Sequence, residues 1–107
     1  MKKEEFRIWL APKRTKRAIS DCISRCAKIE KSMSIDLDLE FEKDYGFNVM
    51  KTLSYGKKDM DQGVEFPGQF VFKDGANRIQ RITDLRASAK QYFLFCEWYI
   101  NKEKGTP

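Results

Sequence analysis

The chain contains no histidine among its 107 residues. Histidine is the most common general base and a frequent zinc and haem ligand, so its absence removes the usual routes to acid–base catalysis and to such metal sites. Neither common type of glycine-rich phosphate-binding loop is present. We therefore expect a protein that is not an enzyme and needs neither a cofactor nor a metal.

Cysteine is also scarce, and the three residues Cys22, Cys26 and Cys96 are odd in number. An odd count argues against a closed disulfide framework, and two sulfurs without histidine make a poor zinc site. Buried thiols in a reduced compartment are the simpler interpretation. No apolar run approaches the roughly 20 residues of a membrane span, and no signal peptide is visible. We therefore expect a soluble, cytoplasmic protein without a membrane partner.

Charge is distributed unevenly along the chain, which carries a net charge of +5. Residues 1–31 contain ten Lys and Arg against four acids, and residues 67–107 contain seven against four. Residues 32–66 reverse the balance, with four against eight. A fold that brings the two ends together would therefore have one basic face and one acidic face.

Apolar spacing predicts one mainly α-helical domain over residues 1–101, followed by a polar tail or linker over 102–107. A first short helix is expected before Pro12, and Thr15 is the expected N-cap of an amphipathic helix that ends near Ser32. A long helix, capped by Asn77, is expected from about Arg78 to about residue 101.

The middle of the chain is less clear. Residues 35–42 alternate between apolar and acidic side chains, so we expect an extended connection rather than a helix. A short helix is predicted around residues 49–53, with Asp44 as its cap and Gly56 at its end. Residues 64–72 fit either a small β-hairpin with Pro67-Gly68 in the turn or a loop with embedded aromatic residues.

Acidic residues between positions 36 and 44 are the only concentrated candidates for metal chemistry. A metal-dependent nuclease needs acids that converge from separate elements, and adjacent positions on one segment do not provide that. We interpret these acids as a solvated edge. Residues 59–63 resemble a calcium loop only weakly, because the distal glutamate is missing.

The strongest local signal is the basic cluster at residues 13–17, which surrounds the predicted cap Thr15. Four cations at the positive end of a helix are mutually unfavourable, and a bound phosphate would relieve that cost. The last helix adds a second basic surface with Arg78, Arg81, Arg86 and Lys90, so the cluster fits a DNA-phosphate clamp better than a solvated turn. The candidate DNA-binding residues are Lys13, Arg14, Thr15, Lys16, Arg17, Arg78, Arg81 and Arg86.

The order of these elements resembles the N-terminal core-binding, SAM-like domain of tyrosine recombinases and phage integrases. The resemblance rests on a Phe-x-x-Trp-Leu helix at 6–10, the helix begun by Thr15, the helix near 49–53, and a Tyr-Phe-x-Phe-x-x-Trp cluster at 92–98. It implies a four-helix bundle that clamps one side of duplex DNA. Recombinase activity is not implied, because the family's catalytic set includes a histidine. Residues 66–72 depart from the family's short connection.

Two functions follow from these observations. The first is a non-catalytic module that clamps the phosphate backbone of duplex DNA as part of a larger recombination or restriction-type protein or complex. The alternative is a protein-interaction adaptor, of phage type, that mimics DNA or inhibits a partner and docks through its acidic segment or its aromatic last helix. Phe95 and Trp98 fall off the apolar stripe and would mark that contact surface if exposed.

Overall fold

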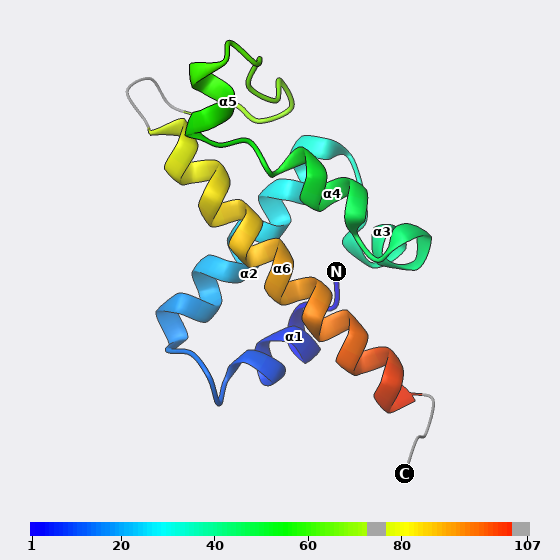
Figure 1. Cartoon of the computed structure of the whole chain (residues 1–107). Helices are drawn as coiled ribbons and strands as arrows, with labels where there is room; N and C mark the ends of the chain where they lie inside the picture. The colour runs from blue at the N-terminus through cyan, green and yellow to red at the C-terminus, as the bar shows by residue number, and fades with distance from the viewer. Residues whose placement is uncertain (73–76, 104–107) are drawn as a thin grey trace.

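Every regular element of the computed structural model is a helix within the residues that it describes, 1–72 and 77–103 (Figure 1). The prediction of a mainly α-helical fold is therefore confirmed. The four expected helices are present together with two more, so the predicted number was too small. The helices are α1 (Lys3–Leu10), α2 (Lys16–Met33), α3 (Leu37–Asp44), α4 (Phe47–Thr52), α5 (Lys57–Asp61) and α6 (Arg78–Glu103).

The helix starts predicted at Thr15 and Asn77 are confirmed by their caps. The Thr15 side chain accepts a hydrogen bond from Ala18 N at 3.2 Å, and Asn77 Oδ1 accepts one from Gln80 N at 3.0 Å. Each bond satisfies one of the N–H groups that the first turn of a helix leaves without an internal partner. Helix α2 ends at Ser34, which adopts the left-handed conformation with φ of 55°. Asp44 is not the N-cap of α4, which is Gly46, although Asp44 Oδ2 accepts from Asn48 N at 3.1 Å.

The acidic alternating segment forms helix α3, so the prediction of an extended connection was wrong. Asp36 Oδ1 caps the helix by accepting from Asp38 N at 2.8 Å. Leu37 and Phe41 are both buried, whereas Leu39 between them is 60% exposed. Two buried residues four positions apart share one helical face, so only half of the apparent strand pattern faces the core.

The segment between α4 and α6 also differs from expectation. Gly56 does not end the short helix but precedes α5, which the sequence pattern did not indicate. No strand occurs in residues 56–72, so the hairpin is not confirmed, and residues 64–72 agree with the alternative, a loop with embedded aromatic residues. The segment contains aromatic contacts instead, with the Tyr55 and Phe66 rings 5.1 Å apart, and Tyr55 Oη donates to Val64 O at 2.7 Å.

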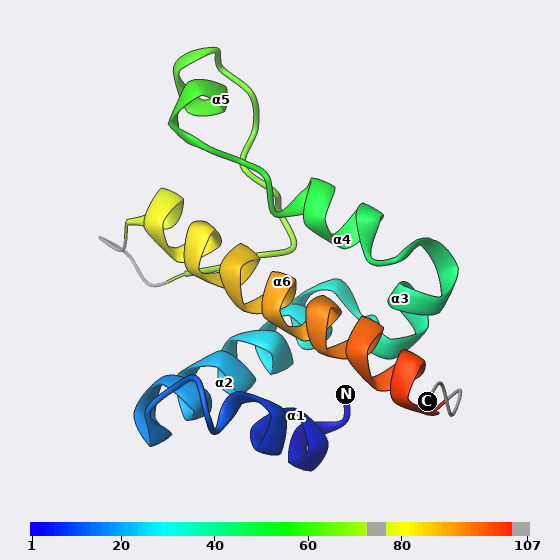
Figure 2. The same cartoon turned by 60° about the horizontal axis from the view of Figure 1, so that its bottom comes forward.

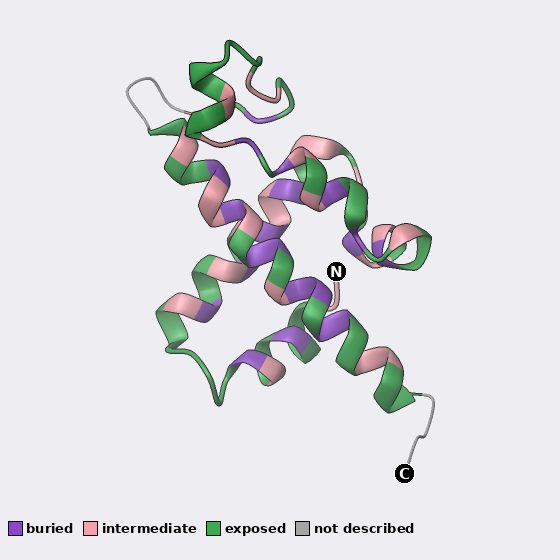
Figure 3. Cartoon of the chain, viewed as in Figure 1, coloured by how far each residue is buried: buried purple, intermediate pink, exposed green. Residues whose placement is uncertain are grey.

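Helix α6 crosses the whole molecule and organises its core. Figure 2 shows α1 and α2 on one side of α6, with α3 and α4 on the other. Buried positions follow α6 along most of its length (Figure 3). The largest group of buried rings joins α1 to α6, where Phe6 lies 4.9 Å from Tyr92 and 5.3 Å from Phe95 between ring centroids. These contacts hold the basic N-terminal third of the chain against its C-terminal third.

Helix α6 ends at Glu103, close to the predicted end at about residue 101, so Lys102 and Glu103 of the predicted tail are helical. The rest of the predicted tail, residues 104–107, lies outside the described residues. None of the helices in the described part of the chain is both long and apolar enough to span a membrane.

Candidate nucleic-acid interface

Two adjoining hollows lie along the line where α2 crosses α6, and both are lined by Arg25 and Asp84. We call this surface the basic groove. Among its lining residues cations outnumber acids by four to two, although the groove lies between two helices of mixed charge. Its charged residues are Arg14, Asp21, Arg25, Lys28, Arg81 and Asp84.

The spacing of residues along α2 explains why these side chains share a surface. Ala18, Asp21, Arg25 and Lys28 follow one another at intervals of three or four, so they lie on one side of the helix. Ala18 is small, as are Ala87 and Ser88 on the facing side of α6. Small side chains at the crossing leave the groove open, while the buried isoleucines of α2 lie on its other side.

Lys28 connects the groove to the chain segment before α6. Its Nζ donates to Val71 O at 3.4 Å and lies 4.9 Å from the centre of the Phe72 ring. These contacts place a cation at the far end of the groove from Arg14. Arg14 precedes α2 by two residues, and Lys28 lies 12 residues, or about 18 Å, beyond the first residue of the helix, so the cations of this surface extend over at least that length.

The structure brings only two of the eight predicted residues, Arg14 and Arg81, into the basic groove. Lys16 and Arg17 are exposed in the first turn of α2. Lys13 is exposed in the preceding turn, and its Nζ lies 3.6 Å from the centre of the Trp9 ring. Thr15 uses its side chain for the helix cap. These four residues adjoin the Arg14 end of the groove.

The arginines of α6 do not form one surface. Arg81 faces the groove, but Arg86, five residues later, is turned by about 140° around the helix. Arg86 Nη1 donates to Leu53 O at 3.4 Å, so it faces the end of α4. Arg78 lies over the Phe66 ring at 4.7 Å. The expectation of a second basic surface made of all three arginines was therefore wrong for Arg86.

Arg25 and Lys28 were not among the predicted site residues. On sequence alone they belong to the polar side of an amphipathic helix, as most exposed lysines and arginines do. Arg25 lies four residues after Asp21, and Lys28 lies three residues after Arg25. This spacing, together with Arg14 before the helix, was the signal in the sequence that these cations share one side of the helix. Nothing local indicates that α6 would add Arg81 opposite them.

Cys22 also lines the basic groove, half-buried between Arg14 and Arg25. Pairing with the neighbouring Cys26 thiol lowers the pKa of Cys22, and burial opposes this shift. A hydrogen bond at Ser88 and the charges of Arg14 and Arg25 also lower it. The same pairing with Cys22, together with burial, raises the pKa of Cys26, whose Sγ donates to Ser88 O at 3.4 Å. Cys22 is therefore the more reactive thiol.

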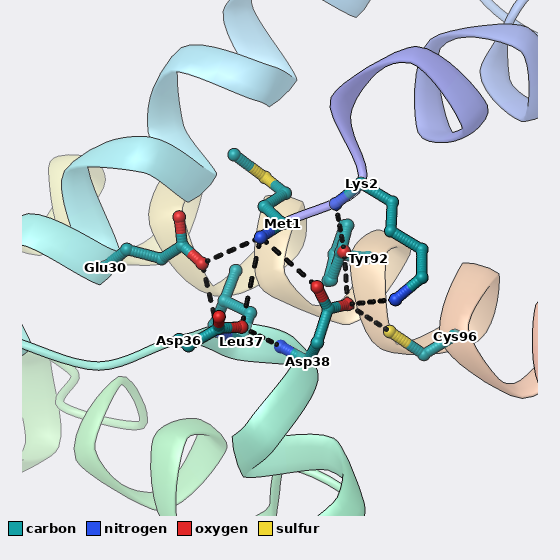
Figure 4. A network of polar contacts seen from close by, with 8 residues as sticks. All are labelled: Met1, Lys2, Glu30, Asp36, Leu37, Asp38, Tyr92 and Cys96. Carbon is teal, nitrogen blue, oxygen red and sulfur yellow. Dashed lines mark hydrogen bonds and ion pairs between the residues drawn. The ribbon is translucent and has the colours of Figure 1, made fainter.

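The acidic segment forms a different kind of site on the other side of α6 (Figure 4). The Met1 ammonium lies 3.2 Å from Asp38 Oδ2 and 3.5 Å from Glu30 Oε2. Tyr92 Oη donates to Asp38 Oδ1 at 2.5 Å and accepts from Lys2 N at 2.8 Å. Asp38 is therefore a structural link between the chain start, α3 and α6, and the interpretation of all these acids as a solvated edge was wrong for it.

Electrostatics in this network follow from its geometry. Burial works to raise the pKa of Asp38, but the hydrogen bond from Tyr92, the Met1 ammonium and Lys2 together lower it below its ordinary value of 3.8. Burial and the bond to Asp38 raise the pKa of Tyr92. Burial, with the Asp38 charge, raises the pKa of Cys96 to about 12. Within residues 1–72 and 77–103, no group of three or more acids, cysteines or histidines could hold a metal ion.

The predicted contact surface at Phe95 and Trp98 is only half correct. Phe95 is fully buried beneath α1, where Phe6 and Trp9 both contact its ring. Trp98 is 44% exposed, and the Lys102 ammonium lies 5.1 Å from its ring centre. Phe95 therefore belongs to the core, and Trp98 alone reaches the surface.

The chain was compared with known proteins in three ways, and no match was found. No protein-family model matches the chain, and neither a curated protein nor a solved structure matches it either.

Proposed function

We propose that the protein is a non-catalytic module that binds the phosphate backbone of duplex DNA through the basic groove. The observation that carries the proposal is the presence of four cations along one crossing of two helices. Lys13, Lys16 and Arg17 lie next to its Arg14 end and increase the positive potential there. A surface of this kind suits a polyanion with regularly spaced charges.

The two acids of the groove limit what it could recognise. Asp21 and Asp84 would repel phosphates directly in front of them, so contacts are expected at the ends of the groove, near Arg14 and near Lys28 and Arg81. Arginine and lysine contacts of this kind fix a protein on the duplex but do not distinguish base sequence. We therefore expect little sequence preference from this chain alone.

We also propose that the chain plays the part that the core-binding module plays in recombinases. The order of α1, α2, α4 and α6 supports it, as does the basic character of the turn that leads into α2. In that context the chain would be the DNA-holding part of a larger cytoplasmic recombination or restriction-type protein or complex. Its own contribution would be affinity, not chemistry.

The test is a salt titration with a labelled random-sequence duplex. Each phosphate that is neutralised contributes about −0.9 to the slope of log affinity against log salt, so the double variant Arg25→Gln/Lys28→Gln should reduce the magnitude of the slope by about 2. Lys16→Gln/Arg17→Gln should also flatten it. The matched control Lys43→Gln/Lys51→Gln removes two exposed charges from α3 and α4, on the other side of α6.

The proposal would be overturned by an absence of binding at low salt. It would also be overturned if the Lys43/Lys51 control weakened binding as much as the groove variant, because the effect would then reflect net charge and not the groove. Circular dichroism of each variant would check that the helices remain folded.

A further inference from the structure

Three adjoining hollows form a second groove, between α3 and the C-terminal half of α6. Phe41 lines all three, Glu42 and Ile100 line two of them, and Tyr45 and Glu97 also line two. The hollows are therefore continuous, and we call this surface the aromatic groove. Its apolar lining residues are Phe41, Tyr45, Phe93, Leu94, Tyr99 and Ile100.

Large apolar side chains are unusually exposed beside this groove. Tyr45 is 80% exposed and Leu94 43%, and Phe47, at the start of α4, is 68% exposed. Contiguous apolar surface of this kind is uncommon on isolated soluble domains and marks a contact surface. None of these residues lines the basic groove, so DNA bound there would leave them exposed.

The length of the aromatic groove suits a helix. Its lining residues on α6 extend from Lys90 to Glu103. Thirteen residues of helix rise by about 20 Å, which corresponds to between three and four turns of a partner helix laid alongside. A partner helix of that length would place an apolar residue every three or four positions against the aromatic floor.

Charge at the rim of the groove indicates which helix fits. Glu42, Glu97 and Glu103 line it, and none of them forms an ion pair within the described part of the chain. Lys90 is the only lining lysine outside the N-terminal network, because Lys2 already lies 3.5 Å from Asp38. Three unpaired carboxylates around an apolar floor complement lysines and arginines that flank an apolar stripe.

We infer that the aromatic groove binds a basic amphipathic helix of another protein. The apolar stripe of that helix packs on the Phe41, Phe93 and Ile100 side of the groove, and its flanking cations pair with Glu42, Glu97 and Glu103. This surface is independent of the basic groove, since α6 lies between the two (Figure 2). The chain would then hold DNA on one side and a protein on the other.

The test uses two labelled synthetic peptides of about 18 residues, or about 27 Å as a helix. Both carry the same leucine stripe at intervals of three and four, and their remaining positions are all lysine in one and all glutamine in the other, because an anionic peptide could bind to the basic groove. Fluorescence anisotropy should detect binding of the lysine peptide only. A protein of net charge +5 repels such a peptide overall, so binding would require a locally acidic surface.

Variants locate the binding site. Glu42→Lys/Glu97→Lys should weaken binding of the lysine peptide by at least about tenfold, because it reverses two rim charges. Glu5→Lys/Asp61→Lys makes the same change at exposed positions of α1 and α5 and should bind much more tightly than the rim variant. Leu94→Gln should also weaken binding while leaving the affinity for duplex DNA unchanged.

Several results would overturn the inference. Equal binding of the two peptides would show that charge plays no part, and equal loss in both charge-reversal variants would show that the rim is not the site. Sedimentation of the chain as a dimer that Leu94→Gln disrupts would identify a second copy as the occupant. Binding to anionic vesicles that Leu94→Gln abolishes would identify a lipid surface instead.

Discussion

The basic groove and the aromatic groove are both built on α6, yet they differ in almost every property. The basic groove lies between α6 and α2, has small side chains at its centre and is lined by four cations. The aromatic groove lies between α6 and α3, has large rings at its centre and three unpaired carboxylates at its rim. One helix therefore supplies two surfaces of opposite charge.

Helical geometry explains how this is possible. Ser88 in the basic groove and Glu97 in the aromatic groove are nine residues apart, which corresponds to about 180° around the helix. The net charge of +5 hides this division, because five of the eight acids of residues 32–66 lie in α3 or at its N-cap. The comparison shows that the distribution of charge over the surface, rather than its sum, decides which partners each side can bind.

The largest effect is expected on the aromatic side, from Gly46→Ala. Gly46 joins α3 to α4 with φ of +80°, and a Cβ built there would clash with the Phe93 ring. The left-handed conformation costs a non-glycine residue about 1–2 kcal/mol, and overpacking a core adds about 1–3 kcal/mol. Urea unfolding should show the combined loss, and lysine-peptide binding should weaken because Phe93 lines the groove.

Gly63→Ala is the matched control for this change. Gly63 also has positive φ, at +77°, but no atom lies within 4 Å of the position that a Cβ would occupy. Its loss should therefore be limited to the backbone cost of about 1–2 kcal/mol. If both variants lost the same free energy of unfolding, the clash with the Phe93 ring would not contribute to the effect of Gly46→Ala.

An intermediate effect is expected from Asp38→Ala, which removes the link between α3 and α6. Tyr92 is fully buried, so its hydroxyl would lose its acceptor in the core, which costs about 1–3 kcal/mol of the free energy of unfolding. Glu42→Ala, on the same helix but exposed and without an ion pair, should change it by less than about 0.5 kcal/mol. Chemical unfolding at pH 7 would compare the two.

The same network predicts a dependence on pH with a definite sign. Because the pKa of Asp38 is lowered below its ordinary value of 3.8, its stabilisation is fully present above that value. It is lost as the pH falls below 3.8 through the lower, folded-state pKa. The difference in stability between the original chain and Asp38→Ala should therefore shrink below about pH 4, and a difference that grew there would contradict the network.

The smallest effect is expected on the basic side, from alkylation of Cys22. Because its pKa is lowered and it is only half-buried, Cys22 should react with iodoacetamide at neutral pH faster than the other two cysteines. Cys26 and Cys96 are buried and should react slowly, as peptide mapping by mass spectrometry would reveal. Alkylated protein should bind DNA more weakly, because the added group occupies the groove beside Arg14 and Arg25.

Cys22→Ser separates this effect from nonspecific damage. The variant should bind DNA like the original chain and should no longer respond to the reagent. If alkylation weakened DNA binding equally in Cys22→Ser, the modification would act elsewhere. Lysine-peptide binding should be unchanged in all these samples, because Cys22 lies in the basic groove.

Much of the fold could be predicted from the sequence wherever local signals agree. Thr15 and Asn77 mark helix starts that the structure confirms, because a cap and the following apolar spacing are both local features. The prediction was wrong at residues 37–44, where the alternation of apolar and acidic residues is also compatible with a helix that buries only Leu37 and Phe41. Local spacing could not choose between these forms, because packing against α6 selects one of them.

The candidate sites depended still more on packing. The lack of histidine, the basic ends, the acidic middle and the places of α1, α2 and α6 can all be read from the sequence. Helix packing was needed to bring Arg81 into one groove with Arg14, to turn Arg86 away from it, and to bury Phe95 beneath α1. A helix depends on neighbours three and four residues away, whereas a groove depends on which distant helix packs against each side.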